Sequence, residues 1–143
     1  MDTQNILVEN VSRTQNILVE KLPPILLTAM FFLSGINKLN NFTKTVDNFK
    51  GKISYALNIN EYIYKIIIIF VIILEILAPI VIVYYYTTGK FKAFSNYTVY
   101  SLIIFIILAT LLYHPLNIND YFKSIPFWAN ISLIGGLLLL LKK

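Results

Sequence analysis

The chain has 143 residues, of which 57% are apolar and only 13% are charged, and its mean hydropathy is +0.70. Soluble domains usually have about 45–50% apolar and about 25% charged residues, while disordered chains combine low hydrophobicity with high net charge. The composition therefore excludes both classes and predicts a protein whose solvent is lipid. The net charge of +5 comes from basic residues that flank apolar segments, which favours anionic lipid headgroups over nucleic acid. The absence of cysteine excludes disulfides, thiolate nucleophiles and iron–sulfur ligation.

The N-terminal residues 1–21 form a tail with an internal repeat. The segment TQNILVE at 3–9 recurs at 14–20, a spacing of 11 residues. Because this spacing is about three helical turns, both copies would present the same helical face. The repeat indicates a duplicated tail, and an amphipathic helix at the membrane surface is the alternative. Asp2 and Glu9, with no basic residue near the start, argue against a secretory signal peptide.

Four long apolar runs lie between residues 22 and 141, at 22–37, 62–86, 97–113 and 125–141. A bilayer core needs about 20 helical residues, with a range of about 17–25, so the first run is marginal unless its helix begins in the tail. Backbone polar groups must be paired inside lipid, which favours helices. The sequence therefore predicts an all-α fold, a four-helix transmembrane bundle in residues 22–141, followed by a basic tail at 142–143.

An even number of spans places both termini on one side of the membrane. The basic residues divide equally between the two sides, so the positive-inside rule does not fix the orientation. We take cytoplasmic termini as the working expectation for this multi-pass protein.

Residues typical of helix ends bound the predicted spans. Asn60 followed by Glu61 is an N-cap pattern, and Gly89 closes the same helix. The third helix is expected to end at His114, before Pro115, and Pro126 suits the first turn of the fourth. Four further residues are expected to anchor the fourth helix at the two membrane surfaces: Phe127, Trp128, Lys142 and Lys143.

The polar segment between the first two spans contains a second helical pattern. Phe42, Val46, Phe49 and Ile53 recur at helical spacing, with charged residues on the remaining faces. This predicts a short amphipathic helix that lies in the membrane interface. An ordinary loop is the alternative, because Gly51 interrupts the pattern.

Glu75 is the most informative residue, since it lies near the middle of the second run. An ionisable side chain at that depth costs about 2.5–3.5 kcal/mol on insertion scales, so it should face the bundle, pair with a cation or stay protonated. Lys38 and His114 are the candidate partners, because both are expected near one membrane face. The three residues are candidates for a polar pocket, and a purely structural tie between helices is the alternative. One histidine and no cysteine leave too few ligands for a transition-metal or haem site.

Small residues and one proline are expected to shape the helix contacts. Pro79 follows Glu75 by one turn and removes a backbone hydrogen bond there. Small side chains allow close approach of membrane helices. The candidates for helix packing are Ser34, Gly35, Pro79, Ser132, Gly135 and Gly136.

The segments 32–39, FLSGINKL, and 127–137, FWANISLIGGL, resemble the first and last motifs of the DoxX-like membrane proteins. Glu75 and His114 are placed like the acidic residue and the histidine of that family's second and third helices. The chain departs from the family at Pro23-Pro24 and at Ala78-Pro79. The resemblance implies a four-helix membrane protein in a redox context, near quinone or sulfur-compound oxidation.

The expected function is an accessory or anchoring subunit of a quinone-linked membrane system, because the chain has no redox centre of its own. Whether it catalyses a reaction stays open. The expected ligand is a quinone or another lipid-like molecule, and the expected partners are the bilayer, a membrane or redox protein and a second copy of the chain. The alternative is a non-enzymatic adaptor or cargo-receptor-like protein. A small transporter is disfavoured, because four helices show no inverted repeat.

Overall fold

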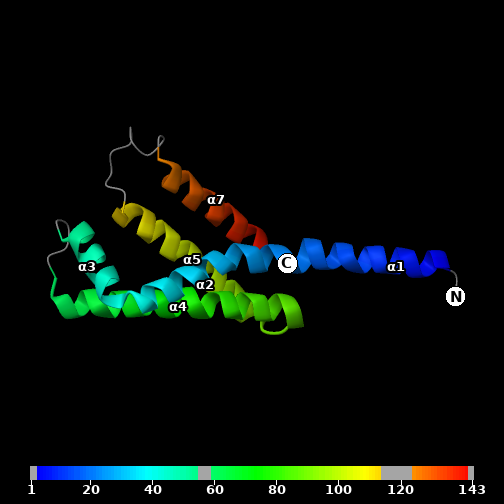
Figure 1. The fold of residues 1–143 in the computed structure, drawn as a ribbon, viewed down its shortest axis with the longest axis horizontal. Helices are drawn as coiled ribbons and strands as arrows, with labels where there is room; N and C mark the ends of the chain where they lie inside the picture. Colours follow the sequence, from blue (N-terminus) through cyan, green and yellow to red (C-terminus); the bar gives the residue numbers. More distant parts are fainter. Residues whose placement is uncertain (1–2, 55–58, 114–123, 142–143) are drawn as a thin grey trace.

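The computed structural model describes residues 3–54, 59–113 and 124–141 (Figure 1). Every regular element in these ranges is helical, which confirms the all-α prediction. The elements are α1 (Thr3–Asn16), the π-helical turn η1 (Ile17–Lys21), α2 (Leu22–Asn40), α3 (Phe42–Ile53), α4 (Glu61–Thr88), α5 (Lys92–Tyr113) and α7 (Ile125–Leu140).

Among the described residues, three helices are long and apolar enough to cross a membrane. They are the continuous helix Glu9–Asn40, which includes α2, together with α4 and α5. The fourth apolar helix, α7, has 16 residues and is shorter. These helices are consistent with an integral membrane protein.

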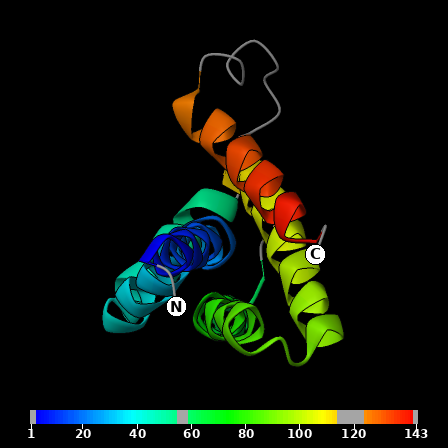
Figure 2. The ribbon, with the colours of Figure 1, turned by 90° about the vertical axis from the view of Figure 1, so that its right-hand side faces the viewer.

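Four helices pack side by side, and we call α2, α4, α5 and α7 together the helical core. α2 packs on α4, α4 on α5 and α5 on α7, and α7 returns to α2. Consecutive members run in opposite directions (Figures 1 and 2). Their shared interior is apolar and includes Phe31, Ile82, Leu102, Ile106 and Leu137.

The outward faces of the helical core are apolar as well. On α4 the exposed residues recur every three or four positions along one side: Ile63, Ile66, Phe70, Ile73, Leu77, Ile80 and Tyr84. Soluble monomers rarely expose a continuous apolar surface of this kind. A helix that is apolar on its buried and its exposed sides is typical of a membrane span.

The ends of α4 follow the predicted capping pattern. The Asn60 side-chain oxygen accepts a hydrogen bond from the Tyr62 backbone N–H at 3.1 Å. Gly89 has a φ of 71° and donates its N–H to the Tyr85 carbonyl at 2.7 Å, so a glycine is required at this left-handed position. α4 continues through the buried Pro79.

α5 begins at Lys92, earlier than the predicted start at Tyr97. Residues 92–96 are too polar for a hydropathy run to include them, yet Ser95 is buried within the first turns of the helix. α7 has Pro126 in its first turn, as predicted.

The N-terminal tail is a helix that continues into α2 through the π-helical turn. α1 extends beyond the end of the helical core (Figure 1), and its described residues from Glu9 to Gln15 are exposed. The π-helical turn lies within the second copy of the repeat and has a wider hydrogen-bond spacing than an α-helix. The side chains of residues 3–8 lie outside the described part of the structure, so the shared face of the two copies stays a prediction.

The predicted amphipathic helix is α3. Its apolar residues Val46, Phe49 and Ile53 are buried, and they pack with Tyr64, Ile68 and Ile72 of α4. Its charged residues Lys44, Asp47, Lys50 and Lys52 are exposed. The apolar face of α3 is thus covered by the first half of α4.

Candidate functional site

α2 and α4 approach each other most closely at Gly35. A Cβ atom at this buried position would lie 2.8 Å from Ile76 Cγ1 and 3.1 Å from Glu75 Cβ. Any side chain larger than hydrogen would therefore separate the two helices. The glycine brings the backbone of α2 against α4 at the position of the Glu75 carboxylate.

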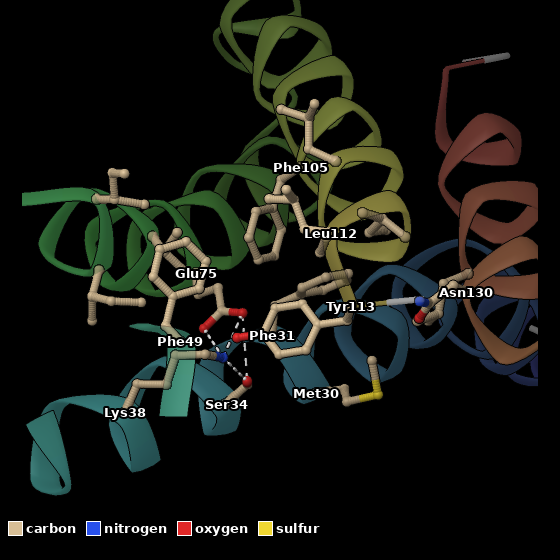
Figure 3. Close-up of a pocket in the computed structure, with 17 residues that line it drawn as sticks. Met30, Phe31, Ser34, Lys38, Phe49, Glu75, Phe105, Leu112, Tyr113 and Asn130 are labelled. Carbon is tan, nitrogen blue, oxygen red and sulfur yellow. Dashed lines mark hydrogen bonds and ion pairs between the residues drawn. The ribbon is translucent and has the colours of Figure 1, made fainter. Parts of the chain in front are cut away.

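Lys38 and Glu75 form an ion pair beside this contact (Figure 3). The Lys38 ammonium donates to both carboxylate oxygens of Glu75, at 2.7 and 2.9 Å. It also donates to the Ser34 hydroxyl at 2.5 Å, and that hydroxyl donates to Glu75 Oε1 at 3.4 Å. Ser34 and Lys38 are four residues apart on α2, which places them on the same helical face.

The pair is asymmetric in its exposure. The Glu75 side chain is 4% exposed and the Lys38 side chain 26% exposed. Burying a charge is costly unless the charge is paired and hydrogen-bonded. Ser34 and Glu75 together accept from all three ammonium protons that Lys38 can donate. No buried side-chain nitrogen or oxygen of the described residues lacks a hydrogen-bond partner.

A cavity of about 550 Å³ lies next to the ion pair. α2, α3, α4, α5 and α7 all contribute to its walls, and most of the lining is aliphatic or aromatic (Figure 3). The labelled residues that line it are Met30, Phe31, Ser34, Lys38, Phe49, Glu75, Phe105, Leu112, Tyr113 and Asn130. A largely apolar cavity with a few polar groups is typical of a small-molecule site.

A second polar group lines the same cavity on α7. The Asn130 side-chain amide donates to the Thr110 hydroxyl of α5 at 2.8 Å, and that hydroxyl donates to the Ile106 carbonyl at 2.7 Å. In Figure 3, Tyr113 lies between Asn130 and the ion pair. Asn130 lies in the motif segment 127–137, but it was not predicted to line the pocket.

Aromatic side chains of α3 and α5 line the cavity near the ion pair. The rings of Phe49 and Tyr113 are 6.4 Å apart between centroids. The Lys52 ammonium lies 5.1 Å from the centroid of the Tyr113 ring, within cation–π range. α3 therefore forms one wall of the site.

The structure brings together two of the three candidate pocket residues, Lys38 and Glu75. His114 lies outside the described residues, as do Lys142 and Lys143. Phe127 and Trp128 are at the start of α7, with ring centroids 5.5 Å apart in an edge-to-face arrangement.

The candidate packing residues differ in their surroundings. Ser34 and Gly35 lie at the contact of α2 with α4, and Pro79 is buried in α4. A Cβ atom at Gly136 would lie 3.0 Å from Leu27 Cδ1, so this glycine faces α2. Ser132 and Gly135 are exposed, and a Cβ atom at Gly135 would meet nothing within 4 Å.

The chemistry available in the cavity is hydrogen bonding and charge. The described residues contain no group of three or more His, Cys, Asp or Glu side chains that could hold a metal ion. The Glu75 carboxylate offers acceptor lone pairs, and the Asn130 side chain offers an amide oxygen and a second amide hydrogen, while the ammonium protons of Lys38 are already donated to Ser34 and Glu75. No family model, curated protein or solved structure matches the chain.

Proposed function

We propose that the helical core is a four-helix transmembrane bundle in which α7 is the fourth span and α3 lies at the membrane interface. The apolar outward faces of the helices support this proposal. α7 would reach about 24 Å at 1.5 Å per residue, which suits a tilted or locally thinned bilayer. The exposed lysines of α3 would face the headgroups while its apolar side stays on α4.

The function that the geometry supports best is binding of a quinone head group in the cavity beside Lys38 and Glu75. The observation that carries it is a buried, fully hydrogen-bonded ion pair at the wall of a largely apolar cavity. A quinone ring is flat and apolar, and its carbonyl oxygens need donors, for which the second amide hydrogen of Asn130 is available. On reduction its hydroxyls need acceptors, which the Glu75 carboxylate supplies.

We assign the chain an accessory or anchoring role in a quinone-linked system, as its resemblance to DoxX-like proteins implies. The motif at residues 32–39 contains Ser34, Gly35 and Lys38, and these are the residues gathered around Glu75. The motif residues and Glu75 therefore meet in one contact between α2 and α4. The partner would be a redox protein of the same membrane.

Quinone binding to a Glu75→Gln variant tests the proposal. The matched control is Glu61→Gln, which removes an exposed carboxylate from the same helix. With radiolabelled decyl-benzoquinone in lipid nanodiscs, we expect Glu75→Gln to weaken binding about tenfold or more, or about 1.4 kcal/mol, and Glu61→Gln to leave it unchanged. Unchanged affinity in a folded Glu75→Gln protein contradicts the proposal.

An adaptor function is the second candidate, and the long exposed helix α1 favours it. In that case α1 and the charged face of α3 would contact a partner, and the ion pair would only hold α2 to α4. Intact quinone binding in Glu75→Gln, together with loss of a partner on deletion of residues 3–20, would support the adaptor.

A further inference from the structure

A separate apolar groove runs between α2 and α7 and has a volume of about 470 Å³. It is lined by Pro23, Leu26 and Leu27 of α2 and by Gly136, Leu139 and Leu140 of α7. All of these residues are apolar, so the groove offers no side-chain hydrogen bond. Its occupant must therefore be hydrocarbon.

The groove adjoins the cavity beside the ion pair. Met30 of α2 and Leu133 of α7 line both of them. The cavity has polar groups, Lys38 and Glu75, in its wall, and the groove has only apolar side chains. A molecule with a polar head and a hydrocarbon tail matches this arrangement, with its head in the cavity and its tail in the groove.

The absence of a side chain at Gly136 keeps part of the groove open. A Cβ atom there would press on Leu27 at 3.0 Å, so a larger residue would occupy the space between the two helices. The neighbouring Gly135 has no such contact. Met30 is 50% exposed on the outer surface, where a membrane would surround it, so the junction is open to the side.

We propose that the groove between α2 and α7 holds the hydrocarbon tail of a lipid-soluble ligand whose head occupies the cavity, and that this ligand enters sideways from the bilayer past Met30. The inference rests on the proposed quinone site and specifies its ligand class as long-tailed. A tailless, water-soluble quinone would use the cavity alone.

A Leu26→Trp substitution tests the tail site, because the larger ring fills the groove and Leu26 does not line the cavity. The matched control is Leu33→Trp on the same helix, since Leu33 is 67% exposed and lines neither space. The probes are radiolabelled decyl-benzoquinone and methyl-benzoquinone, with affinities corrected for partition into empty nanodiscs. Leu139→Trp, on the other side of the groove, is the second variant should Leu26→Trp fail to fold.

We expect Leu26→Trp to bind decyl-benzoquinone about tenfold more weakly, a change of about 1.4 kcal/mol, and to bind methyl-benzoquinone as the unchanged protein does. Leu33→Trp should leave both affinities unchanged. Equal losses for both probes, or an equal loss in Leu33→Trp, would overturn the tail site while the head site stands. If neither probe binds the unchanged protein above the empty-nanodisc background, the quinone site itself fails, and the tail site fails with it.

Discussion

At the scale of single residues, the carboxylate of Glu75 is stable among apolar helices because three groups on α2 are arranged around it. Gly35 allows the close approach, Lys38 supplies the opposite charge and Ser34 accepts the remaining ammonium proton. Removing one partner from a buried ion pair is more costly than replacing both by apolar residues, because a lone charge is then left without solvation.

A double-mutant cycle tests whether Lys38 and Glu75 stabilise each other as a pair. Lys38→Met should lower the free energy of unfolding by about 3 kcal/mol, the lower part of the range for buried pairs because the lysine is partly exposed. Lys38→Met combined with Glu75→Leu should recover most of that loss. The measurement is reversible unfolding in mixed micelles, with Lys65→Met in the exposed Glu61–Lys65 pair as a control that changes little. Additive losses would show that the two charges are not coupled.

The sequence indicated Glu75 because an ionisable residue inside an apolar run is conspicuous, and Lys38 because it is a cation at the end of the first run. It could not place them in contact, since the contact depends on where α2 crosses α4. That crossing depends on Gly35 meeting Ile76, a tertiary fact. The place of Asn130 at the cavity could not be predicted for the same reason, because its partner Thr110 lies on another helix.

At the scale of the elements, the α2–α4 contact and α3 position the site. α2 supplies the motif residues, α4 supplies the carboxylate, and α3 packs over the first half of α4 and contributes Phe49 to the cavity. The periodicity of residues 42–53 predicted α3 as a helix but could not show that a neighbouring helix would cover its apolar face. The start of α5 at Lys92 was also missed. The first turns of this helix contain polar residues, one of which, Ser95, is buried, and a hydropathy run does not include them.

Two glycine substitutions separate packing from helix propensity. Gly35→Ala should destabilise the protein by about 1–3 kcal/mol, because the added methyl group would lie 2.8 Å from Ile76 Cγ1. Gly51→Ala, in α3, meets nothing within 4 Å and should stabilise the protein by about 0.5–1 kcal/mol through helix propensity. The same unfolding assay measures both. A neutral Gly35→Ala would mean that α2 and α4 are less tightly packed than the structure shows.

At the scale of the whole molecule, the helical core and α3 line a cavity that adjoins an apolar groove, and the N-terminal helix extends away from the core (Figure 1). The hydropathy of the sequence predicted the apolar helices and nearly all of their ends. It could not show the N-terminal extension of the first helix, because the tail is polar and its π-helical turn has no distinct sequence signal.

The cavity and the groove both require α7 to lie beside α2 inside the membrane, so the number of spans is decisive. The chain contains no cysteine, so a single introduced cysteine is the only thiol that a membrane-impermeant maleimide can label. With four spans, Asn10→Cys, Lys90→Cys and Lys143→Cys are labelled from one side of oriented vesicles, and Ser54→Cys is labelled from the other. Labelling of Lys143→Cys from the same side as Ser54→Cys would mean that α7 does not cross, and would contradict the bundle and the ligand site built on it.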